Sequence, residues 1–401
     1  MRAQAHASLP SRLVYLSPVP LGSFAQRPHH FVHWFHERFG ARVLWIDPGP
    51  SRLPRLSDWP RLVRWFQGGG PALGPHWQKA DWLGHAAPRV LPLEPFAIGR
   101  LVNRWLWRDL LRQVDAFVTP DTLLVMAKPC ALSLELGRRY PQLPLVFDAM
   151  DSMPGFCTGV SRRWMEQAEA AQAERADRIW ASSHALAAHH AHHAHKTTLV
   201  LNALTLPAST PGPSQSSDSP LAAGRRPVLG YLGVIDHWFD WALLLRLAGQ
   251  YPEAEVRLVG PVRHAAPRPL PPNVRCLPAV PQHQVYEVLR GFDAGLIPFA
   301  RDAVTEYVDP VKYYEYRALG LPVLSTRFGE MAHRGLADGV HFLEDLLAPV
   351  APAGTPALQA LLAERPDPQQ AQAFCREHSW ANRFEAAAHT LVAGVQPGVQ
   401  G

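Results

Sequence analysis

Short apolar runs alternate along the chain with longer stretches in which apolar residues recur at helical spacing. The runs RLVYLS (12–17) and ARVLWID (41–47) are typical of buried strands. Residues 27–40 lie between them, with apolar and aromatic side chains three or four positions apart and a terminal Gly40, which predicts a helix and its end. The alternation continues along most of the chain. We therefore expect an α/β protein with parallel sheets covered by helices on both faces.

One segment interrupts this alternation. Residues 204–227 (LTLPASTPGPSQSSDSPLAAGRRP) are rich in Pro, Ser, Gly and Ala and have little to bury, which predicts a linker. We expect one α/β domain over 1–203, a second over 228–378, and a last amphipathic helix over 379–395 that packs back on the first domain. Two such domains form a cleft, and parallel sheets bind ligands at the carboxyl ends of their strands.

Composition and charge narrow the class of protein. The 401 residues are 47% hydrophobic and 18% charged, which favours a packed globular chain over a disordered one. Residues 1–150 hold 18 Lys and Arg against 10 Asp and Glu, whereas the whole chain has a net charge of only +5. A basic first part suits a membrane surface, a phosphorylated lipid or nucleic acid, although a GC-rich genome that favours Arg would give the same excess.

Other features concern location and partners. The four Cys form no C-x-x-C pair, which suits a reducing cytoplasm and gives no zinc ribbon or disulfide scaffold. We find no signal peptide and no apolar run of about 18 residues, so we expect a cytoplasmic protein. Residues 52–66 mix Arg with Leu, Trp and Phe, and could lie on the inner face of the plasma membrane or form a half-buried helix. No nucleic-acid or dinucleotide motif is present.

The segment DPVKYYEYRALGLPVLST (309–326) carries the candidate chemistry. Pro310 suits the first turn of a helix, and Lys312 in that turn would meet the amides and dipole that attract an anion. A cation there opposes the dipole, so Lys312 makes better sense beside a diphosphate. Glu315 follows one turn later and could accept hydrogen bonds from ribose hydroxyls. Alternatively, the two residues are an ordinary surface ion pair. Gly320 would end the helix.

The order P-x-K-x-x-E-Y-x-A-x-G-x-P-V in this segment resembles the donor-site signature of GT-B glycosyltransferases. The similarity is greatest to the bacterial exopolysaccharide and teichuronic-acid type, which shares features with the xanthan glucuronosyltransferase and with families 1 and 4. The stretches LGYLGVIDHWFDWALLLRLAGQYPEAEVRLVGPV (229–262) and LPPNVRCLPAVPQHQVYEVLRGFDAGLIPF (270–299) support it, as do VFDAMDSMPGF and ADRIWASSHAL. This resemblance implies two Rossmann-like domains facing a cleft, and transfer of a sugar from a nucleoside-diphosphate sugar to an acceptor hydroxyl without a metal.

The resemblance also implies roles for single residues. Lys312 would bind the donor diphosphate and Glu315 the ribose. The other donor-binding residues that we expect are Gly230, Gly233, Val280, Tyr307 and Pro310. Asp151 matches the catalytic base of inverting relatives, with Asp148 as the fallback. Retaining relatives often carry a second Glu where this chain has Tyr307, so we favour inversion of the anomeric centre.

The acceptor side is less defined by the sequence. Arg27, His29 and His30 follow the first strand, where a loop at the carboxyl edge of the sheet could hold an acceptor, although they could also be the surface of a helix start. We expect a lipid-linked or glycan acceptor of the cell envelope, UDP ahead of GDP in the donor, and no cofactor. The alternatives are a nucleotide-sugar 2-epimerase of the same architecture and an inactive polysaccharide-assembly protein.

Six histidines lie within residues 184–195. Their spacing on a helix could hold zinc or nickel. No Cys or carboxylate is interleaved with them, so we predict no functional metal site from this stretch alone.

Overall fold

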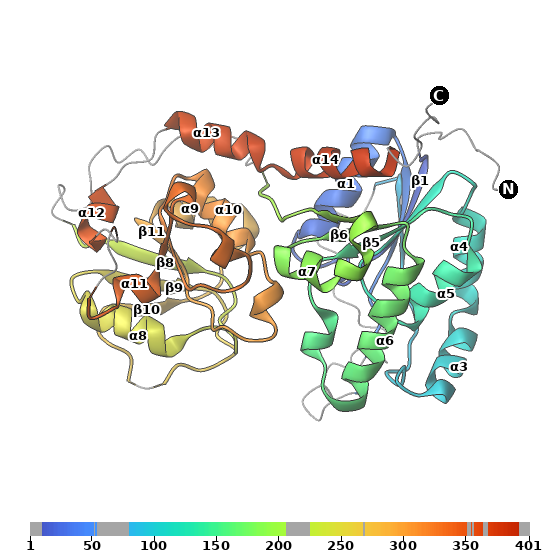
Figure 1. Cartoon of the computed structure of the whole chain (residues 1–401), viewed down its shortest axis with the longest axis horizontal. Helices are drawn as coiled ribbons and strands as arrows, with labels where there is room; N and C mark the ends of the chain where they lie inside the picture. The colour runs from blue at the N-terminus through green and yellow to red at the C-terminus, as the bar shows by residue number, and fades with distance from the viewer. Residues whose placement is uncertain are drawn as a thin grey trace. The chain divides into compact units, whose positions relative to one another are not determined.

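The computed structural model describes residues 10–51, 53, 80–205, 225–267, 269–350, 354, 357–363 and 368–392. It divides into two compact units, residues 1–200 with 384–401 and residues 201–383, called unit 1 and unit 2 below. Most of the predicted linker and nearly all of the basic stretch 52–66 lie outside the described residues. Each unit is an α/β structure with its own parallel sheet (Figure 1).

Unit 1 contains a seven-stranded sheet in the order β3-β2-β1-β4-β5-β6-β7, with every pair parallel. Its strands are β1 (Arg12–Leu16), β2 (Arg42–Ile46), β3 (Leu83–Ala86), β4 (Thr122–Met126), β5 (Leu145–Ala149), β6 (Arg178–Ala181) and β7 (Thr197–Leu199). Its helices are α1 (Arg27–Phe39), α3 (Ala97–Leu106), α4 (Arg108–Phe117), α5 (Ala131–Arg139), η2 (Met153–Phe156), α6 (Gly159–Arg175), α7 (His184–His189) and η3 (Ala191–Lys196).

Unit 2 contains a six-stranded parallel sheet in the order β10-β9-β8-β11-β12-β13. Its strands are β8 (Val228–Leu232), β9 (Glu255–Val259), β10 (Val274–Leu277), β11 (Ala294–Ile297), β12 (Val323–Ser325) and β13 (Val340–Phe342). Its helices are α8 (Trp241–Gln250), η4 (Gln282–Gln284), α9 (Val285–Arg290), η5 (Thr305–Tyr307), α10 (Val311–Ala318), η6 (Gly329–His333), η7 (Leu336–Asp338), α11 (Leu343–Leu346), α12 (Leu358–Ala363) and α13 (Pro368–Glu377).

The hydrophobic pattern explains these elements. All five side chains of β4 and of β5 are buried, as expected for central strands of a parallel sheet covered on both faces. The strands and helix predicted over residues 12–47 are confirmed as β1, α1 and β2, and Gly40 ends α1 with a φ of +62°. Each unit also has its own buried apolar cluster.

The two sheets have the same strand order, except that the sheet of unit 1 has β7 as an additional edge strand. In each, the strand order reverses beside the first strand, between β1 and β4 in unit 1 and between β8 and β11 in unit 2. Ligands of such doubly wound sheets bind at this switch point, beyond the carboxyl ends of the strands. The fold therefore indicates one candidate ligand-binding edge in each unit.

The last helix, α14 (Trp380–Val392), crosses the division between the units. From Phe384 onward it belongs to unit 1, where the Phe384 ring packs 5.2 Å from the Phe31 ring of α1. Arg38 and Glu385 add an exposed ion pair of 3.0 Å.

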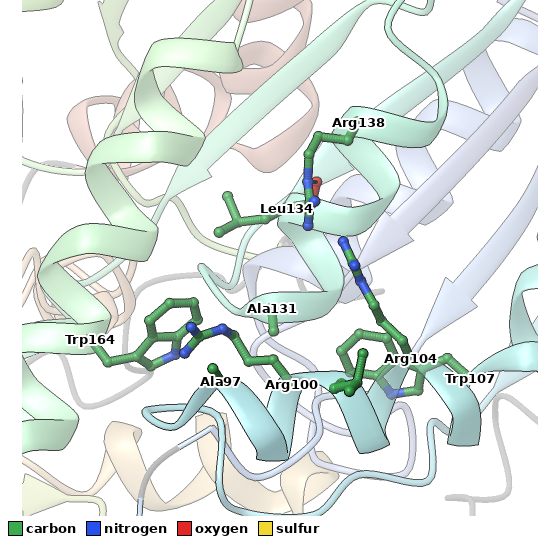
Figure 2. Close-up of a pocket in the computed structure, with 9 residues that line it drawn as sticks. Ala97, Arg100, Arg104, Trp107, Ala131, Leu134, Arg138 and Trp164 are labelled. Carbon is green, nitrogen blue, oxygen red and sulfur yellow. Dashed lines mark hydrogen bonds between the residues drawn. The ribbon is translucent and has the colours of Figure 1, made fainter.

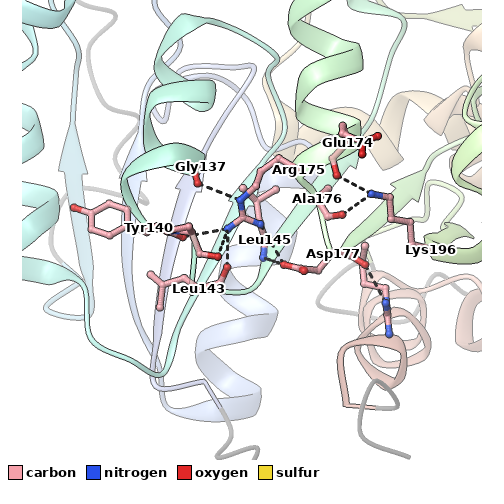
Figure 3. A network of polar contacts seen from close by, with 11 residues as sticks. Gly137, Tyr140, Leu143, Leu145, Glu174, Arg175, Ala176, Asp177 and Lys196 are labelled. Atoms are coloured by element: carbon pink, nitrogen blue, oxygen red, sulfur yellow. Dashed lines mark hydrogen bonds and ion pairs between the residues drawn. The ribbon is translucent and has the colours of Figure 1, made fainter. Parts of the chain in front are cut away.

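Two cations bind backbone carbonyls, one near the carboxyl end of α5 and the other at the carboxyl end of α6 (Figure 3). The Arg175 guanidinium donates to the carbonyls of Gly137, Tyr140 and Leu143 at 3.0–3.1 Å. The Lys196 ammonium donates to the carbonyls of Glu174 and Ala176, at 3.0 and 2.8 Å. Basic side chains commonly satisfy the last carbonyls of a helix. Here they also fix α6 against α5 and against the end of η3.

Candidate functional site

Helix α10 lies at the switch point of unit 2, after β11. It begins at Val311, and Pro310 is its N-cap with extended backbone, φ −76° and ψ 121°. We expected Pro310 inside the first turn, but its carbonyl already accepts the hydrogen bond from the Tyr313 amide at 3.0 Å, so it precedes that turn. Lys312 is in the first turn as predicted. Gly320 follows the helix with a φ of +70°, which confirms the predicted end.

The Lys312 ammonium lies beside two aromatic rings at the ends of the central strands. Its Nζ is 5.3 Å from the ring centroid of Tyr231 in β8 and 5.7 Å from that of Phe299, which follows β11. Among the described residues, no hydrogen bond or ion pair to this ammonium is present. Burial lowers the pKa of Lys312, and Glu315 partly opposes that shift. A partly buried cation without an anionic partner is arranged to receive an anion.

Gly233 makes room for this ammonium. Its φ of +147° is a conformation that residues with a side chain rarely adopt, and a Cβ there would lie 2.6 Å from Lys312 Cε and 2.8 Å from Nζ. Gly230 has a different reason to be glycine, because a Cβ there would lie 2.1 Å from the Phe292 ring. The structure thus gives Gly230 a packing role in the core, and its contact with a donor stays a prediction.

Glu315 lies one turn after Lys312 on α10. It is partly buried, and burial raises the pKa of its carboxyl to about 6, while Lys312 lowers it. Within the described part of the chain this carboxylate accepts no hydrogen bond. A carboxylate and an ammonium that make no hydrogen bond or ion pair with the described residues fit a ligand that carries hydroxyl and anionic groups.

The loop before α10 is anchored by a residue that the sequence did not single out. The Asp309 side chain is fully buried and accepts hydrogen bonds at 2.8 Å from the Asn202 amide, the Tyr314 hydroxyl and Arg334. Asp is common in loops and turns, so nothing in the sequence signalled this buried network. Because Asp309 is adjacent to the N-cap of α10, the network helps to fix the start of that helix.

Two further predicted donor residues lie on the same edge of the sheet. Val280 comes three residues after β10 and is partly buried against the core of unit 2. Tyr307 closes η5 in the loop after β11 and is also partly buried. The carboxyl ends of parallel strands meet at one edge, so the structure brings Val280, Gly233 and Lys312 to that edge.

Asp148 of unit 1 belongs to a buried ion pair. Its carboxylate contacts Arg27 at 2.8 Å, with both side chains 1% exposed, and accepts a hydrogen bond from the Tyr15 hydroxyl at 3.0 Å. Arg27 also donates to the Val200 carbonyl at 2.6 Å. In this arrangement Asp148 is the counter-charge of Arg27 and joins α1 to the sheet. Its fallback role as a base stays a prediction.

Asp151 differs from Asp148 in its surroundings. It follows β5 at the carboxyl edge of the sheet and is only partly buried, and its carboxylate has no hydrogen-bond or ion-pair partner among the residues that the structure describes. Burial raises the pKa of Asp151 to about 7, against the lowering effect of Arg27. A carboxylate that titrates near neutral pH is suited to act as a general base.

The predicted acceptor residues lie at the start of α1. His29 is completely buried, with its Nε2 3.2 Å from the Leu21 carbonyl and its Nδ1 accepting from the Gln26 amide at 3.2 Å. His30 is partly buried, and burial lowers its pKa to about 4. Arg27 and His29 therefore have structural roles in α1, and acceptor contact by these residues and His30 stays a prediction.

A separate pocket of about 230 Å³ lies between α3, α5 and α6 in unit 1 (Figure 2). Three arginines line it together with Trp164 and Trp107. Arg104 and Arg138 both contact Glu135, at 2.8 and 3.1 Å, and Arg100 lies 4.5 Å from the Trp164 ring centroid. On the neighbouring surface of α3, three apolar side chains are more than half exposed, namely Ile98, Leu101 and Trp105. Sequence reasoning had not indicated this surface.

Among the described residues, no helix has the length and apolar character needed to cross a bilayer.

Comparison with known proteins identifies the architecture. No family model matches the chain, and no curated protein does. Solved structures do match over nearly the full length. HepE from Anabaena, in complex with UDP-glucose, is 14% identical over 95% of this chain and 99% of its own, with a TM-score of 0.60. This chain has the GT-B fold.

Two further structures support that conclusion. Sucrose-phosphate synthase from Thermosynechococcus elongatus is 12% identical over 96% of this chain and 100% of its own, with a TM-score of 0.62. An α,α-trehalose 6-phosphate synthase from Burkholderia multivorans is 14% identical over 96% and 100% of the two chains, with a TM-score of 0.60. The predicted α/β fold class with two Rossmann-like sheets is therefore confirmed.

Proposed function

We propose that this protein is a glycosyltransferase that moves a sugar from a nucleoside-diphosphate sugar, with UDP ahead of GDP, to an acceptor hydroxyl. The observation that carries the proposal is the Lys312 ammonium, which has no anionic partner in the described protein and lies at the β8–β11 switch point against Gly233. Support comes from the fold, because HepE with the same architecture has been solved with UDP and with UDP-glucose.

In the proposed donor complex, Lys312 and the amides at the start of α10 hold the diphosphate. They stabilise the negative charge that grows on the leaving group as the sugar departs, so they act mainly in the transition state. Glu315 accepts hydrogen bonds from the ribose hydroxyls. Val280 contributes to the base pocket, and Tyr307 belongs to the loop that precedes the diphosphate site.

We assign the general base to Asp151. Deprotonation of the acceptor hydroxyl by this carboxylate lets the oxygen attack the anomeric carbon with inversion, and the proton ends on Asp151. Tyr307 in place of a second Glu favours inversion over retention. Because Lys312 and helix amides meet the diphosphate charge, we propose a transfer step that uses neither a metal ion nor a cofactor.

For the acceptor we propose a lipid-linked or glycan intermediate of cell-envelope or exopolysaccharide assembly, reached by peripheral contact with the inner face of the plasma membrane. The support is the surface of α3, where exposed Ile98, Leu101 and Trp105 accompany a group of arginines. Apolar and aromatic side chains enter the interface of a bilayer, while Arg attracts anionic headgroups.

A thermal-shift panel of nucleoside diphosphates and their sugars tests the proposal. A donor at 100 times its dissociation constant adds about 2.7 kcal/mol of stability, and we expect UDP or a UDP-sugar to raise the melting temperature most. Product analysis with the donor alone separates the alternatives. Conversion of the sugar without an acceptor would indicate an epimerase, and absence of any stabilisation across the panel would favour an inactive assembly protein.

A further inference from the structure

A second group of polar side chains converges in unit 1, between α6 and the end of α7. Glu169 comes from α6, His189 is the last residue of α7, and His190 follows it. The Nε2 atoms of His189 and His190 lie 3.5 and 3.6 Å from the same oxygen, Oε1 of Glu169. One possible ligand atom from each of the three residues lies within 4.8 Å of the others.

The carboxylate at the centre of this group is buried, and no residue in the described ranges donates a hydrogen bond to it. Glu169 is 3% exposed and His190 is 4% exposed. Both carboxylate oxygens of Glu169 and the Nε2 of His190 lack a hydrogen-bond partner among the residues that the structure describes. A buried carboxylate in this state is costly unless a charge is close to it, and contacts of 3.5 Å are longer than a good charge-assisted hydrogen bond. The geometry therefore leaves room for a cation between the three residues.

We propose that Glu169, His189 and His190 bind a divalent transition metal ion, with Zn²⁺ as the preferred ion. Zinc takes imidazole nitrogen and carboxylate oxygen at about 2.0–2.2 Å, and tetrahedral angles then place neighbouring ligand atoms about 3.4 Å apart. The observed distances of 3.5 and 3.6 Å agree with that spacing. The site would have three protein ligands, and the half-exposed His189 leaves a side open to solvent for entry and a fourth ligand.

The surrounding structure holds the segments that carry these ligands. Ser183 caps α7 by accepting a hydrogen bond from the Leu186 amide at 3.2 Å, and the Phe147 ring of β5 contacts the His190 imidazole edge-on at 5.5 Å. Lys196 ties the end of η3 to the carbonyls at the carboxyl end of α6 (Figure 3). Metal binding would join α6 and α7 directly. The proposal concerns residues of unit 1 and does not depend on the proposed transfer activity.

Equilibrium dialysis and isothermal titration with Zn²⁺ test the site, on the full-length protein without an affinity tag and after treatment with a chelator. We expect one tightly bound Zn²⁺ per chain. Mutation of a residue that only hydrogen-bonds to a metal ligand already weakens metal binding about 10–100-fold. The variants Glu169→Gln and His190→Ala remove ligands themselves, so we expect them to weaken binding at least about tenfold.

The matched control uses histidines of the same stretch that lie outside the group. His192 and His195 are exposed, and His192→Ala/His195→Ala should leave the affinity for the tight ion unchanged. If this control loses Zn²⁺ binding while Glu169→Gln retains it, the exposed histidines bind the ion and the proposal is wrong. The absence of tight Zn²⁺ binding in the parent protein would also overturn the proposal. If Glu169→Gln does not fold, His189→Ala, at a half-exposed position, decides by the same titration.

Discussion

At the scale of the residue, the proposed donor site depends on the Lys312 ammonium, which lies beside the aromatic rings of Tyr231 and Phe299. We predict that Lys312→Met, which keeps the length of the side chain and removes its charge, lowers UDP affinity by about 1.5–3 kcal/mol, the contribution of a charge-assisted hydrogen bond. Isothermal titration with UDP measures this change. The melting temperature of the ligand-free variant should not fall, because the ammonium is partly desolvated and forms no ion pair with the residues that the structure describes.

Arg290→Met is the matched control, because Arg290 is an exposed cation of the same unit at the end of α9. It should bind UDP like the parent protein. Equal UDP affinity in Lys312→Met and the parent would place the diphosphate elsewhere.

Asp151 supports a prediction about pH. Its pKa is raised from 3.8 to about 7, so the deprotonated form that a base requires accumulates only as the pH passes neutrality. We predict that the rate of transfer at saturating donor rises with pH and levels off above about 7, and that Asp151→Asn abolishes transfer while UDP still binds. An initial-rate profile from pH 5 to 9 measures this. A rate that is flat across that range would assign the base to another group.

The Asp151 carboxyl also makes the stability of the folded protein depend on pH. Between pH 3.8 and about 7 the folded protein holds a proton that the unfolded chain has released, so the free energy of unfolding falls as the pH rises through this window. In Asp151→Asn this contribution is absent. Urea unfolding of both proteins at pH 5 and pH 8 should therefore show a smaller decrease in the variant.

Some of these residues could be found from the sequence, and others could not. The sequence predicts a diphosphate beside Lys312 because a cation in the first turn of a helix is unfavourable unless an anion lies beside it. It predicts ribose hydroxyls beside Glu315, one turn later, and both roles stay predictions. The ion pair between Arg27 and Asp148 was not predictable, because the two residues are 121 positions apart and only tertiary packing joins them. The complete burial of His29 is also a result of tertiary packing. Asp309 and Arg334 are only 25 positions apart, but their contact also depends on tertiary packing.

At the scale of the element, the Arg27–Asp148 pair connects the start of α1 to β5. Removing one partner leaves a buried charge without compensation, so we predict that Arg27→Met lowers the free energy of unfolding by about 3–5 kcal/mol. Chemical denaturation followed by circular dichroism measures the loss. The double variant Arg27→Met/Asp148→Leu should recover much of it, because neither charge remains. A single variant as stable as the parent would contradict the structural role assigned to the pair.

Helix α3 gives a prediction about surfaces. The triple variant Ile98→Ser/Leu101→Ser/Trp105→Ser removes three exposed apolar side chains and should leave the fold intact. We predict that the parent protein sediments with vesicles of mixed zwitterionic and anionic lipid, less so with purely zwitterionic ones, and that the triple variant loses most of this binding. The exposed Val350→Ser, in unit 2, is the control. Equal sedimentation of parent and triple variant would exclude α3 as the docking element.

The hydrophobic pattern predicts the boundaries of some helices and strands but not of others. Strong periodicity placed β1, α1 and β2 correctly, because buried strands and amphipathic helices differ in period. The histidine-rich stretch, considered as helical from its spacing, divides at His190, where φ is −94° and ψ is 25°. Neither Gly nor Pro marks this break. It lets two consecutive histidines face one carboxylate, an arrangement that regular helical spacing does not give.

At the scale of the whole molecule, strand–helix alternation interrupted by a Pro- and Ser-rich segment was enough to predict two parallel sheets. The strand order within each sheet is a tertiary property, although right-handed crossovers restrict the possibilities. Neither the strand–helix alternation nor the crossover rule predicts the contact of Glu169 with the two histidines, because no local pattern connects α6 with α7. The two proposed ligands consequently belong to different parts of the chain.

This separation leads to a prediction for hydrogen exchange of the full-length protein followed by mass spectrometry. UDP should slow exchange in the peptides around Gly233 and the first turn of α10, where the proposed diphosphate site lies. Zn²⁺ should slow exchange in α7 and the residues that follow it, because the ion would hold the end of that short helix against α6 and suppress local opening. In Lys312→Met the protection by UDP should disappear and the protection by Zn²⁺ should remain. In His190→Ala the protection by Zn²⁺ should disappear and the protection by UDP should remain. Loss of both effects in either variant would show that the two sites are not independent.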